Sequence, residues 1–291
     1  MVGDEMESVT FINARGEEIE FYSSPYQLEV LNGLGDVSAD VQRQKAAFQN
    51  GSTFIGAYLN ERFIDISFKI RGEDYDDIMN KRRELARIVN PVLGLGTIII
   101  KSNGQIRTIG AVAEALPSYP SGQSNRGWAW QNSSISFICP DPYFTGGPSD
   151  DVSYKLEDFV GNFRFPFHFK VRFATRGDSK IIYNDSDADC PVIVEFRGLA
   201  KNPVIKNDTT GQFIKVERVI PEGYTLIINT AFGNKSVNIV APDGVSESAM
   251  NYISNDSQFF MLQQGENKIS FISEEGEPEV FINYKKRYSA I

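Results

Sequence analysis

The stretch GAYLNERFIDISFKIRGEDYDDIMNKRRELARIVNP, residues 56–91, carries the most regular pattern in the sequence. Between Arg62 and Arg71 apolar and polar residues alternate, which is typical of a strand with one buried face. Every second residue from Ile66 to Ile70 is apolar and would point to the same side of that strand. Gly72 interrupts the alternation and predicts the end of the strand.

The residues after Gly72 predict a helix capped by Asp74 and ended by Pro91. Acidic residues fill its first turn and basic residues its later turns, an order that complements the helix dipole. Asp77 and Lys81 are spaced as a stabilising ion pair. An apolar stripe is predicted at Tyr75, Ile78, Leu85 and Val89, with Met79 and Ile88 beside it. Since no catalytic residue type accompanies this pattern, we interpret the stretch as a rigid building block.

Further strands are predicted on both sides of this block. Residues 9–22 indicate a hairpin, and residues 26–31 indicate a short strand. Residues 97–113 indicate a second hairpin, because Asn103-Gly104 is a strong signal for a tight turn. Residues 130–139 indicate a strand that ends at a proline-rich turn.

The segment from Gly33 to Ser52 follows neither a strand pattern nor a helix pattern. Its residues are polar and mixed, and a segment of this length without regular structure has a function or is mobile. Two interpretations stay open: an arm that contacts another molecule through a few apolar side chains, or a disordered surface loop.

The character of the chain changes after residues 146–151, GGPSDD, which indicate a domain boundary. Short strands separated by turns are expected at residues 167–174, 180–184, 192–197, 212–216, 224–229, 236–240 and 268–273. The sequence therefore predicts a mainly β protein. Residues 1–148 would form an α+β domain with one main helix, and residues 149–291 a β-sandwich or jelly roll.

Composition excludes several classes of function. The 291 residues include 38 acidic and 29 basic side chains, a net charge of −9 that argues against a specific nucleic-acid partner. The acidic amino terminus is unlike a signal peptide, and no apolar run has the length of a membrane span. We therefore expect no membrane partner and synthesis in the cytosol. The two cysteines, Cys139 and Cys190, are expected to be buried free thiols.

Residues that could carry chemistry are few. The single histidine, His168, alternates with phenylalanines and is interpreted as structural, because no nucleophile motif accompanies it. Asp185, Asp187 and Asp189 resemble a calcium loop but lack its glycine and distal glutamate, so a solvated acidic turn is favoured over a weak surface Ca²⁺ site. We predict no enzyme activity, no catalytic residues, no metal and no cofactor; a cell-wall hydrolase stays as an alternative that zymography would test.

The order of motifs resembles the distal tail protein family of long-tailed siphophages and prophages. In the first domain the resemblance rests on Tyr58-Leu59, the strand from Ile64, Arg82-Arg83, Asn90-Pro91 and the segment ISFICPDPYF at residues 135–144. In the second it rests on residues 181–216, although Asp185-Ser186-Asp187 stands where a glycine-containing turn is common in the family. The resemblance spans residues 55–240.

The resemblance implies a structural component of a phage tail tip. It implies an amino-terminal belt domain that closes into a ring of six copies, and a galectin-like carboxy-terminal domain. Implied partners are the tail tube protein, the protein that binds the tail tip or tape measure and, in some relatives, a receptor-binding protein. The implied location is the virion, after assembly in the bacterial cytoplasm. We place the ring contacts at Val41, Phe48, Phe54 and Tyr58. The alternative is a carbohydrate-binding adhesion module that acts through the β-sandwich.

Overall fold

The computed structural model describes residues 7–147, 150–156 and 176–291. His168 and the strand expected at residues 167–174 lie outside these residues. The chain divides into two compact units. The first unit extends to Gly147 and also includes residues 288–291, whereas the second spans residues 148–287.

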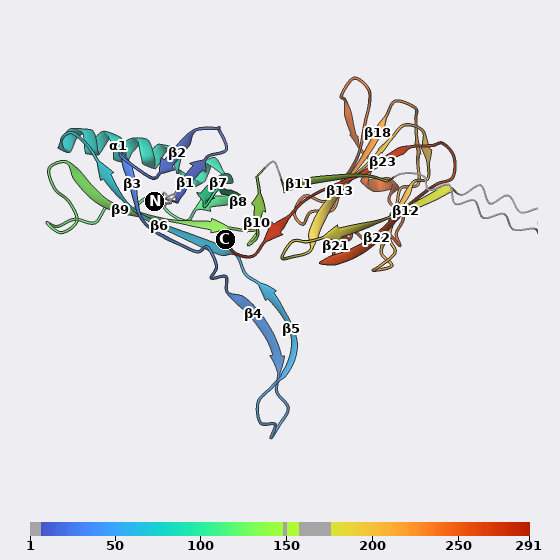
Figure 1. Cartoon of the computed structure of the whole chain (residues 1–291), viewed down its shortest axis with the longest axis horizontal. Helices are drawn as coiled ribbons and strands as arrows, with labels where there is room; N and C mark the ends of the chain where they lie inside the picture. Colours follow the sequence, from blue (N-terminus) through green and yellow to red (C-terminus); the bar gives the residue numbers. More distant parts are fainter. Residues whose placement is uncertain (1–6, 148–149, 157–175) are drawn as a thin grey trace, which may run out of the picture. The chain divides into compact units, whose positions relative to one another are not determined.

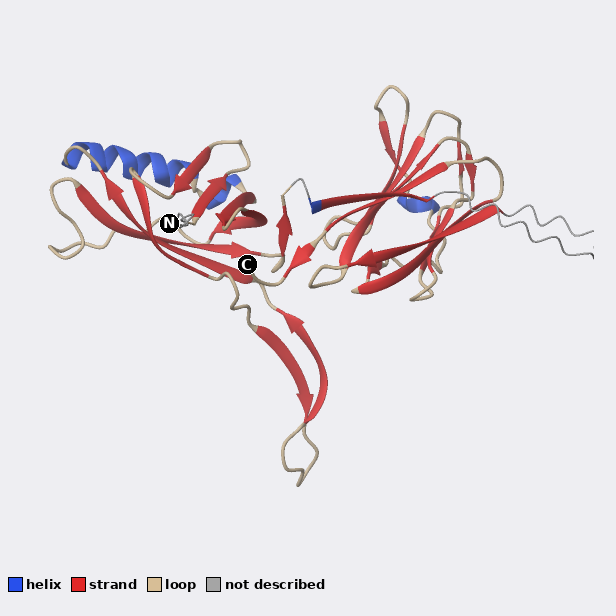
Figure 2. Cartoon of the chain, in the orientation of Figure 1, coloured by secondary structure: helices blue, strands red, loops and turns tan. Residues whose placement is uncertain are grey.

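Strands dominate both units, so the prediction of a mainly β fold is confirmed (Figure 2). The described residues contain one α-helix, α1 (Tyr75–Ile88), and none of their helices is long and apolar enough to cross a membrane.

The first unit is built on one antiparallel sheet with strand order β2-β1-β7-β8-β9-β6-β3. Its strands are β1 (Ser8–Ile12), β2 (Glu18–Phe21), β3 (Tyr26–Asn32), β6 (Arg62–Arg71), β7 (Gly96–Ser102), β8 (Gln105–Ala113), β9 (Trp130–Cys139), β10 (Phe144–Gly146) and β24 (Arg287–Tyr288). The short strand β10 pairs with β8 and with β24, so the end of the chain joins this sheet. A bridge between Tyr22 and Gln27 brings the two edges of the sheet together.

The predicted alternation in β6 is observed. Ile64, Ile66, Phe68 and Ile70 are fully buried, while the residues between them are exposed or half-buried. β6 lies between β3 and β9 in the sheet, where its inner face packs into the core of the unit.

Helix α1 covers one side of this sheet (Figure 1). The Asp74 side chain accepts a hydrogen bond from the Asp77 backbone N–H, as the sequence predicts. Ile78, Leu85 and Ile88 of the helix are buried against the sheet. Tyr75 was expected in this apolar stripe, but it remains 44% exposed because it lies in the first turn, beyond the edge of the core.

The second unit has two main sheets. The larger has strand order β11-β23-β13-β18-β19-β20 with β21 attached to β13, and the smaller has order β12-β22-β15-β16. The strands are β11 (Asp151–Leu156), β12 (Arg176–Asn184), β13 (Cys190–Arg197), β14 (Ala200–Lys201), β15 (Val204–Asn207), β16 (Phe213–Lys215), β17 (Val219–Ile220), β18 (Thr225–Asn229), β19 (Ser236–Val240), β20 (Ser246–Ser248), β21 (Met261–Leu262), β22 (Gly265–Ser273) and β23 (Glu279–Lys285).

The two sheets face each other across one apolar core. Val194 and Phe196 of β13 share that core with Ile205 of β15 and Phe271 of β22, and the rings of Phe196 and Phe271 meet edge to face at 6.2 Å. This unit is the β-sandwich that the sequence predicts.

Candidate functional site

A separate hairpin leaves the first unit between β3 and β6. Its strands are β4 (Ala39–Gln44) and β5 (Thr53–Leu59), and within the described part of the chain they form a two-stranded sheet of their own. We call residues 39–59 the arm; Figure 1 shows it as an isolated ribbon pointing away from the main sheet. Every residue of β4 is exposed, and so is β5 except for half-buried Gly56.

The segment from Gly33 to Ser52, for which the sequence predicted no regular structure, therefore contains a strand. β4 reads ADVQRQ, and it has no apolar alternation because neither of its faces is buried by the rest of the chain. Propensity and pattern signals report burial, so a strand that is open on both faces gives a weak signal.

The register of the arm gives it one apolar face. Residues that pair across two strands share a face, and the pairs on one face are Ala39 with Leu59, Val41 with Ala57 and Arg43 with Phe54. Ile55 has no partner in the register and forms a β-bulge between the last two of these pairs. The opposite face carries Asp40, Gln42, Gln44, Thr53 and Tyr58.

The four side chains expected at a ring contact are thus distributed over the arm. Val41 is 49% and Phe54 66% exposed, and both lie on the apolar face. Tyr58 is 68% exposed and lies opposite Asp40 on the polar face. Phe48 lies in the turn between the strands.

Phe48 is exposed and conformationally unusual. Its side chain is fully exposed, and its backbone has φ of +64°. A bulky residue with positive φ carries a cost of about 1–2 kcal/mol. The tip therefore keeps a strained phenylalanine at a place where the folded chain gives it nothing to pack against.

Residues 33–38 lead from β3 into the arm, and we call them its foot. The foot is held by Arg62, which is fully buried. Its Nη1 donates a hydrogen bond to the Gly33 carbonyl oxygen at 2.6 Å, its Nη2 to that of Ser289 at 2.6 Å and its Nε to that of Pro142 at 2.8 Å. The guanidinium carbon lies 4.4 Å from the centroid of the Phe144 ring. Burial lowers the pKa of Arg62, yet a guanidinium with three carbonyl acceptors stays charged at neutral pH. One side chain thus joins the foot of the arm, residues 288–291 and the turn before β10.

Backbone contacts complete this foot. Gly33 has φ of +94°, and a Cβ placed there would lie 1.9 Å from the Phe63 carbonyl oxygen, so only glycine fits. The Ile291 N–H donates to the Leu34 carbonyl oxygen at 3.2 Å. These contacts fix the direction in which the chain leaves the sheet to form the arm.

Sequence reasoning missed the role of Arg62, although a signal was present. Arg62 lies two residues before Ile64 and therefore shares the inward face of β6 with the buried isoleucines. An arginine that shares one face of a strand with buried apolar residues is predicted to be buried as well. Its guanidinium then needs hydrogen-bond acceptors inside the protein.

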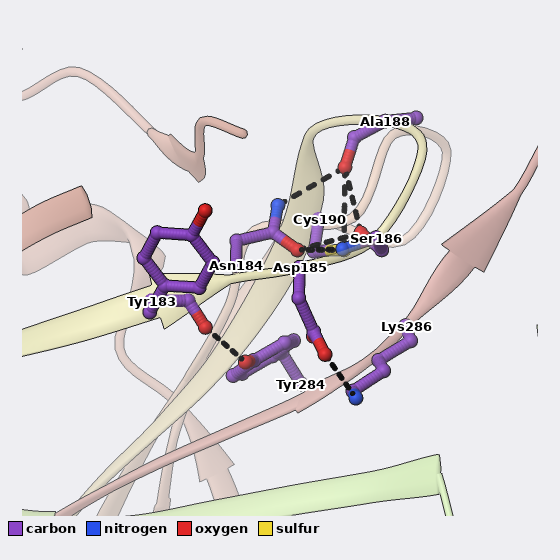
Figure 3. Close-up of polar contacts among 8 residues, drawn as sticks. All are labelled: Tyr183, Asn184, Asp185, Ser186, Ala188, Cys190, Tyr284 and Lys286. Carbon is purple, nitrogen blue, oxygen red and sulfur yellow. Dashed lines mark hydrogen bonds and ion pairs between the residues drawn. The ribbon is translucent and has the colours of Figure 1, made fainter. Parts of the chain in front are cut away.

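The acidic turn at residues 184–190 is closed by its own hydrogen bonds (Figure 3). The Asn184 side chain donates to the carbonyl oxygens of Ala188 and Leu262, and its Oδ1 accepts from the Ser186 hydroxyl at 2.6 Å. Asp185 forms an ion pair with Lys286 at 2.8 Å, which holds the pKa of this carboxyl below its usual range. Among the described residues, no three acidic, histidine or cysteine side chains are grouped to hold a metal ion.

Both cysteines are buried free thiols. Burial raises the pKa of Cys139 to about 12 and also raises that of Cys190, whose Sγ lies 3.1 Å from the Ser186 hydroxyl. A thiol with a raised pKa is a poor nucleophile at neutral pH.

Two family models match the chain. Residues 14–139 match the phage tail protein RIFT-related domain, and residues 185–288 match the carboxy-terminal domain of the siphovirus-type tail component. No curated protein matches the sequence.

Solved structures show the same fold at low sequence identity. The crystal structure of the SPP1 Dit protein, described as a paradigm of the hub adsorption apparatus in phages that infect Gram-positive bacteria, superposes with a TM-score of 0.71 at 12% identity, covering 97% of this chain and 99% of that chain. A chain of the phage p2 baseplate, in its activated conformation with Ca, superposes with a TM-score of 0.56 at 10% identity, covering 98% of this chain and 99% of that chain.

The two family models both describe phage tail proteins, they match residues 14–139 and 185–288 of one chain, and that chain has the fold of the SPP1 Dit protein. The protein therefore belongs to the distal tail protein family of siphophages.

Proposed function

We propose that this chain is the subunit of a ring, of six copies, that joins the phage tail tube to the tail-tip apparatus. One observation carries this proposal: the arm presents a mainly apolar face that the other described residues of its chain leave open. An exposed, contiguous apolar surface on a soluble protein is characteristic of an interaction site.

The geometry of the arm provides the kind of contact that a ring needs. A cyclic ring needs one surface of each copy to meet a different surface of the next copy. The arm is a single projecting element, and its foot is fixed by Arg62 and Gly33. A rigid arm that reaches one neighbour in one direction produces this head-to-tail contact.

The proposed role is structural, without catalysis or a cofactor. The ring assembles in the host cytoplasm and is carried in the virion, with the tail tube protein on one side and the protein that binds the tail tip or tape measure on the other. The second unit is free to hold a receptor-binding protein.

The mass of the full-length chain in solution tests the ring. Six copies of a 32.6 kDa chain have a mass of roughly 196 kDa. We expect that mass by light scattering after gel filtration, and hollow rings by negative-stain imaging. A chain that stays monomeric at high concentration would contradict a ring that closes by itself.

Two variants test the contact. Val41→Asp and Phe54→Asp place a carboxylate on the apolar face of the arm, and each is expected to weaken association at least about 10-fold, because buried apolar anchors carry most of the energy of an interface. Both residues are exposed in the single chain, so its thermal unfolding should not change. The matched control is Val92→Asp, at an 89% exposed position outside the arm, and it should assemble like the wild type.

Adhesion through the β-sandwich stays as the alternative. The second unit contains no tryptophan, and the two most exposed aromatic rings among its described residues, Tyr183 and Phe232, lie on β12 and in the turn after β18. A glycan array probed with the full-length chain separates the two functions. Tight binding of a cell-wall polysaccharide that is lost with Tyr183→Ala would favour adhesion.

A further inference from the structure

A groove lies at the start of helix α1, at the opposite end of β6 from the arm. It has a volume of about 580 Å³. Its lining residues are Asp74, Tyr75, Asp76, Arg126, Gly127 and Trp128. We call it the α1 groove.

The fold builds this groove from two segments of the first unit. The Gly72 N–H, between β6 and α1, donates to the Ala129 carbonyl oxygen at 3.0 Å, which brings the loop before β9 against the helix start. The Asp74 side chain is used in capping the helix, whereas Asp76 is exposed.

Two aromatic rings are open to solvent in the α1 groove. Tyr75 is 44% and Trp128 76% exposed. Tryptophan and tyrosine are enriched among the residues that dominate binding energy. Each of these rings has a large apolar surface to bury against a partner. The groove therefore has aromatic walls, an acidic edge at Asp74 and Asp76, and one basic side chain, Arg126, on the opposite segment.

The tip of the arm has the complementary character. From Arg43 to Phe54 the sequence RQKAAFQNGSTF contains two basic residues and no acidic one. This is unusual in a chain of net charge −9, in which the first fifty residues contain only one other base, Arg15. Phe48 supplies an exposed ring, and its positive φ means that the tip tolerates strain to present it.

We propose that the tip of the arm docks into the α1 groove of the next copy in the ring. Phe48 packs between the rings of Tyr75 and Trp128, and Lys45 lies beside Asp76. This inference rests on the proposed ring and names its second surface. Arm and groove lie at opposite ends of β6, a ten-residue strand of about 33 Å, so one copy offers both surfaces to two different neighbours.

Disulfide trapping in the full-length chain tests the contact directly. Ala47→Cys and Arg126→Cys, combined in one chain, place thiols beside Phe48 and Trp128 and keep both rings. The native cysteines are buried and do not compete. After mild oxidation we expect a ladder of covalent multimers that ends at the mass of the closed ring. The matched control combines Ala47→Cys with Val92→Cys, at an 89% exposed position past the other end of α1, and it should give no ladder.

Charge reversal gives a second readout. Lys45→Glu and Asp76→Lys should each weaken ring formation by about 2- to 5-fold, the effect of one exposed ion pair. The double variant should recover most of the loss, whereas Lys101→Glu on β7 should have no effect.

The outcomes separate the two proposals. Rings that form in the wild type but show no specific cross-link and no rescue by the double variant would overturn the docking contact and leave the ring standing. Equal cross-linking of the control pair would also overturn it. A wild-type chain that never forms rings would overturn both.

Discussion

Two hairpins of the first unit, β7–β8 and the arm, share a secondary structure and differ in what covers them. In the hairpin of β7 and β8, Ile98, Ile100, Ile109 and Ala111 are buried in the core of the unit. In the arm, Val41, Phe54 and Leu59 occupy one face and remain 40–66% exposed. The first hairpin meets its apolar partner within its own chain, and the second does not.

The difference separates apolar surface that the folding of one chain buries from apolar surface that it leaves exposed. An isolated two-stranded hairpin is marginally stable in water, because it buries too little apolar surface. The arm keeps its direction through its foot, where Arg62 binds the Gly33 carbonyl oxygen. A covered hairpin therefore stabilises the chain itself, whereas an open one leaves apolar surface for the contact between subunits that we propose.

The largest expected effect separates the two hairpins by stability. Ile100→Asp places a carboxylate in the core of the first unit, where Ile100 is 1% exposed, and we expect a loss of at least about 4 kcal/mol in the free energy of unfolding. Phe54→Asp, the matched change in the arm, should alter it by less than about 0.5 kcal/mol. Thermal and denaturant unfolding of the two variants measures both values. Equal destabilisation would mean that the arm is part of the core.

The next effect concerns the foot of the arm. Arg62→Met removes the donors to three carbonyl groups, one of them buried and two half-buried, and we expect a loss of about 3 kcal/mol together with faster amide exchange in residues 33–34 and 288–291. Arg71→Met, at the exposed end of the same strand, is the control and should leave both unchanged. If the tail stayed protected in the Arg62 variant, the arm and the tail would be held by other contacts.

The turns of the two hairpins give a smaller effect of opposite sign. Gly104, in the turn after β7, has φ of +72°, so Gly104→Ala should cost about 1 kcal/mol. Phe48→Gly should relieve about the same strain at the arm tip, slowing amide exchange in the arm while weakening the ring. Exchange that became faster in the Phe48 variant would show that the phenylalanine stabilises the arm itself.

The smallest expected effect is on the reactivity of Cys139, whose thiol should not react in the folded chain. The raised pKa and burial of Cys139, on the covered sheet, predict no reaction with a thiol reagent in the folded chain at pH 8. A Val41→Cys thiol on the arm should react at once in the monomer and become protected in the ring. Because the pKa of Cys139 is raised on folding, its contribution to stability is present below the unfolded pKa near 9 and is lost as the pH rises above that value. Rapid modification of Cys139 at pH 8 would mean that this sheet opens.

The elements that the sequence predicted are those whose periodic apolar residues are buried within the chain. β6 was predicted from alternating residues that are now seen to be buried, and α1 from its Asp74 cap and its terminal Asn90-Pro91. The strands of the sandwich, such as β13 and β18, follow the same logic. Each of these elements carries enough apolar periodicity to be recognised alone.

The arm and its foot could not be predicted in the same way. β4 contains one large apolar residue, Val41, and the apolar face appears only when the register with β5 and the bulge at Ile55 are known. The contact of Arg62 with Ser289 joins residues 227 positions apart, and no local sequence pattern predicts which acceptor Arg62 will find. The candidate residues were proposed because apolar side chains stand out in a polar segment, whereas their division between two faces needed the structure.

Residues 288–291 belong to the first unit but are synthesised after the second unit, so the first unit is completed late in translation. Ribosomes add about 5–20 residues per second, so these residues follow Gly147 by roughly 7–28 s. Until then the Arg62 guanidinium lacks its Ser289 acceptor, and Leu34 lacks the Ile291 N–H. A chain that stops short, after a premature stop codon or a proteolytic cut, carries an arm with an unfinished foot. The contacts that fix the direction of the arm are therefore complete only after the second unit has been synthesised.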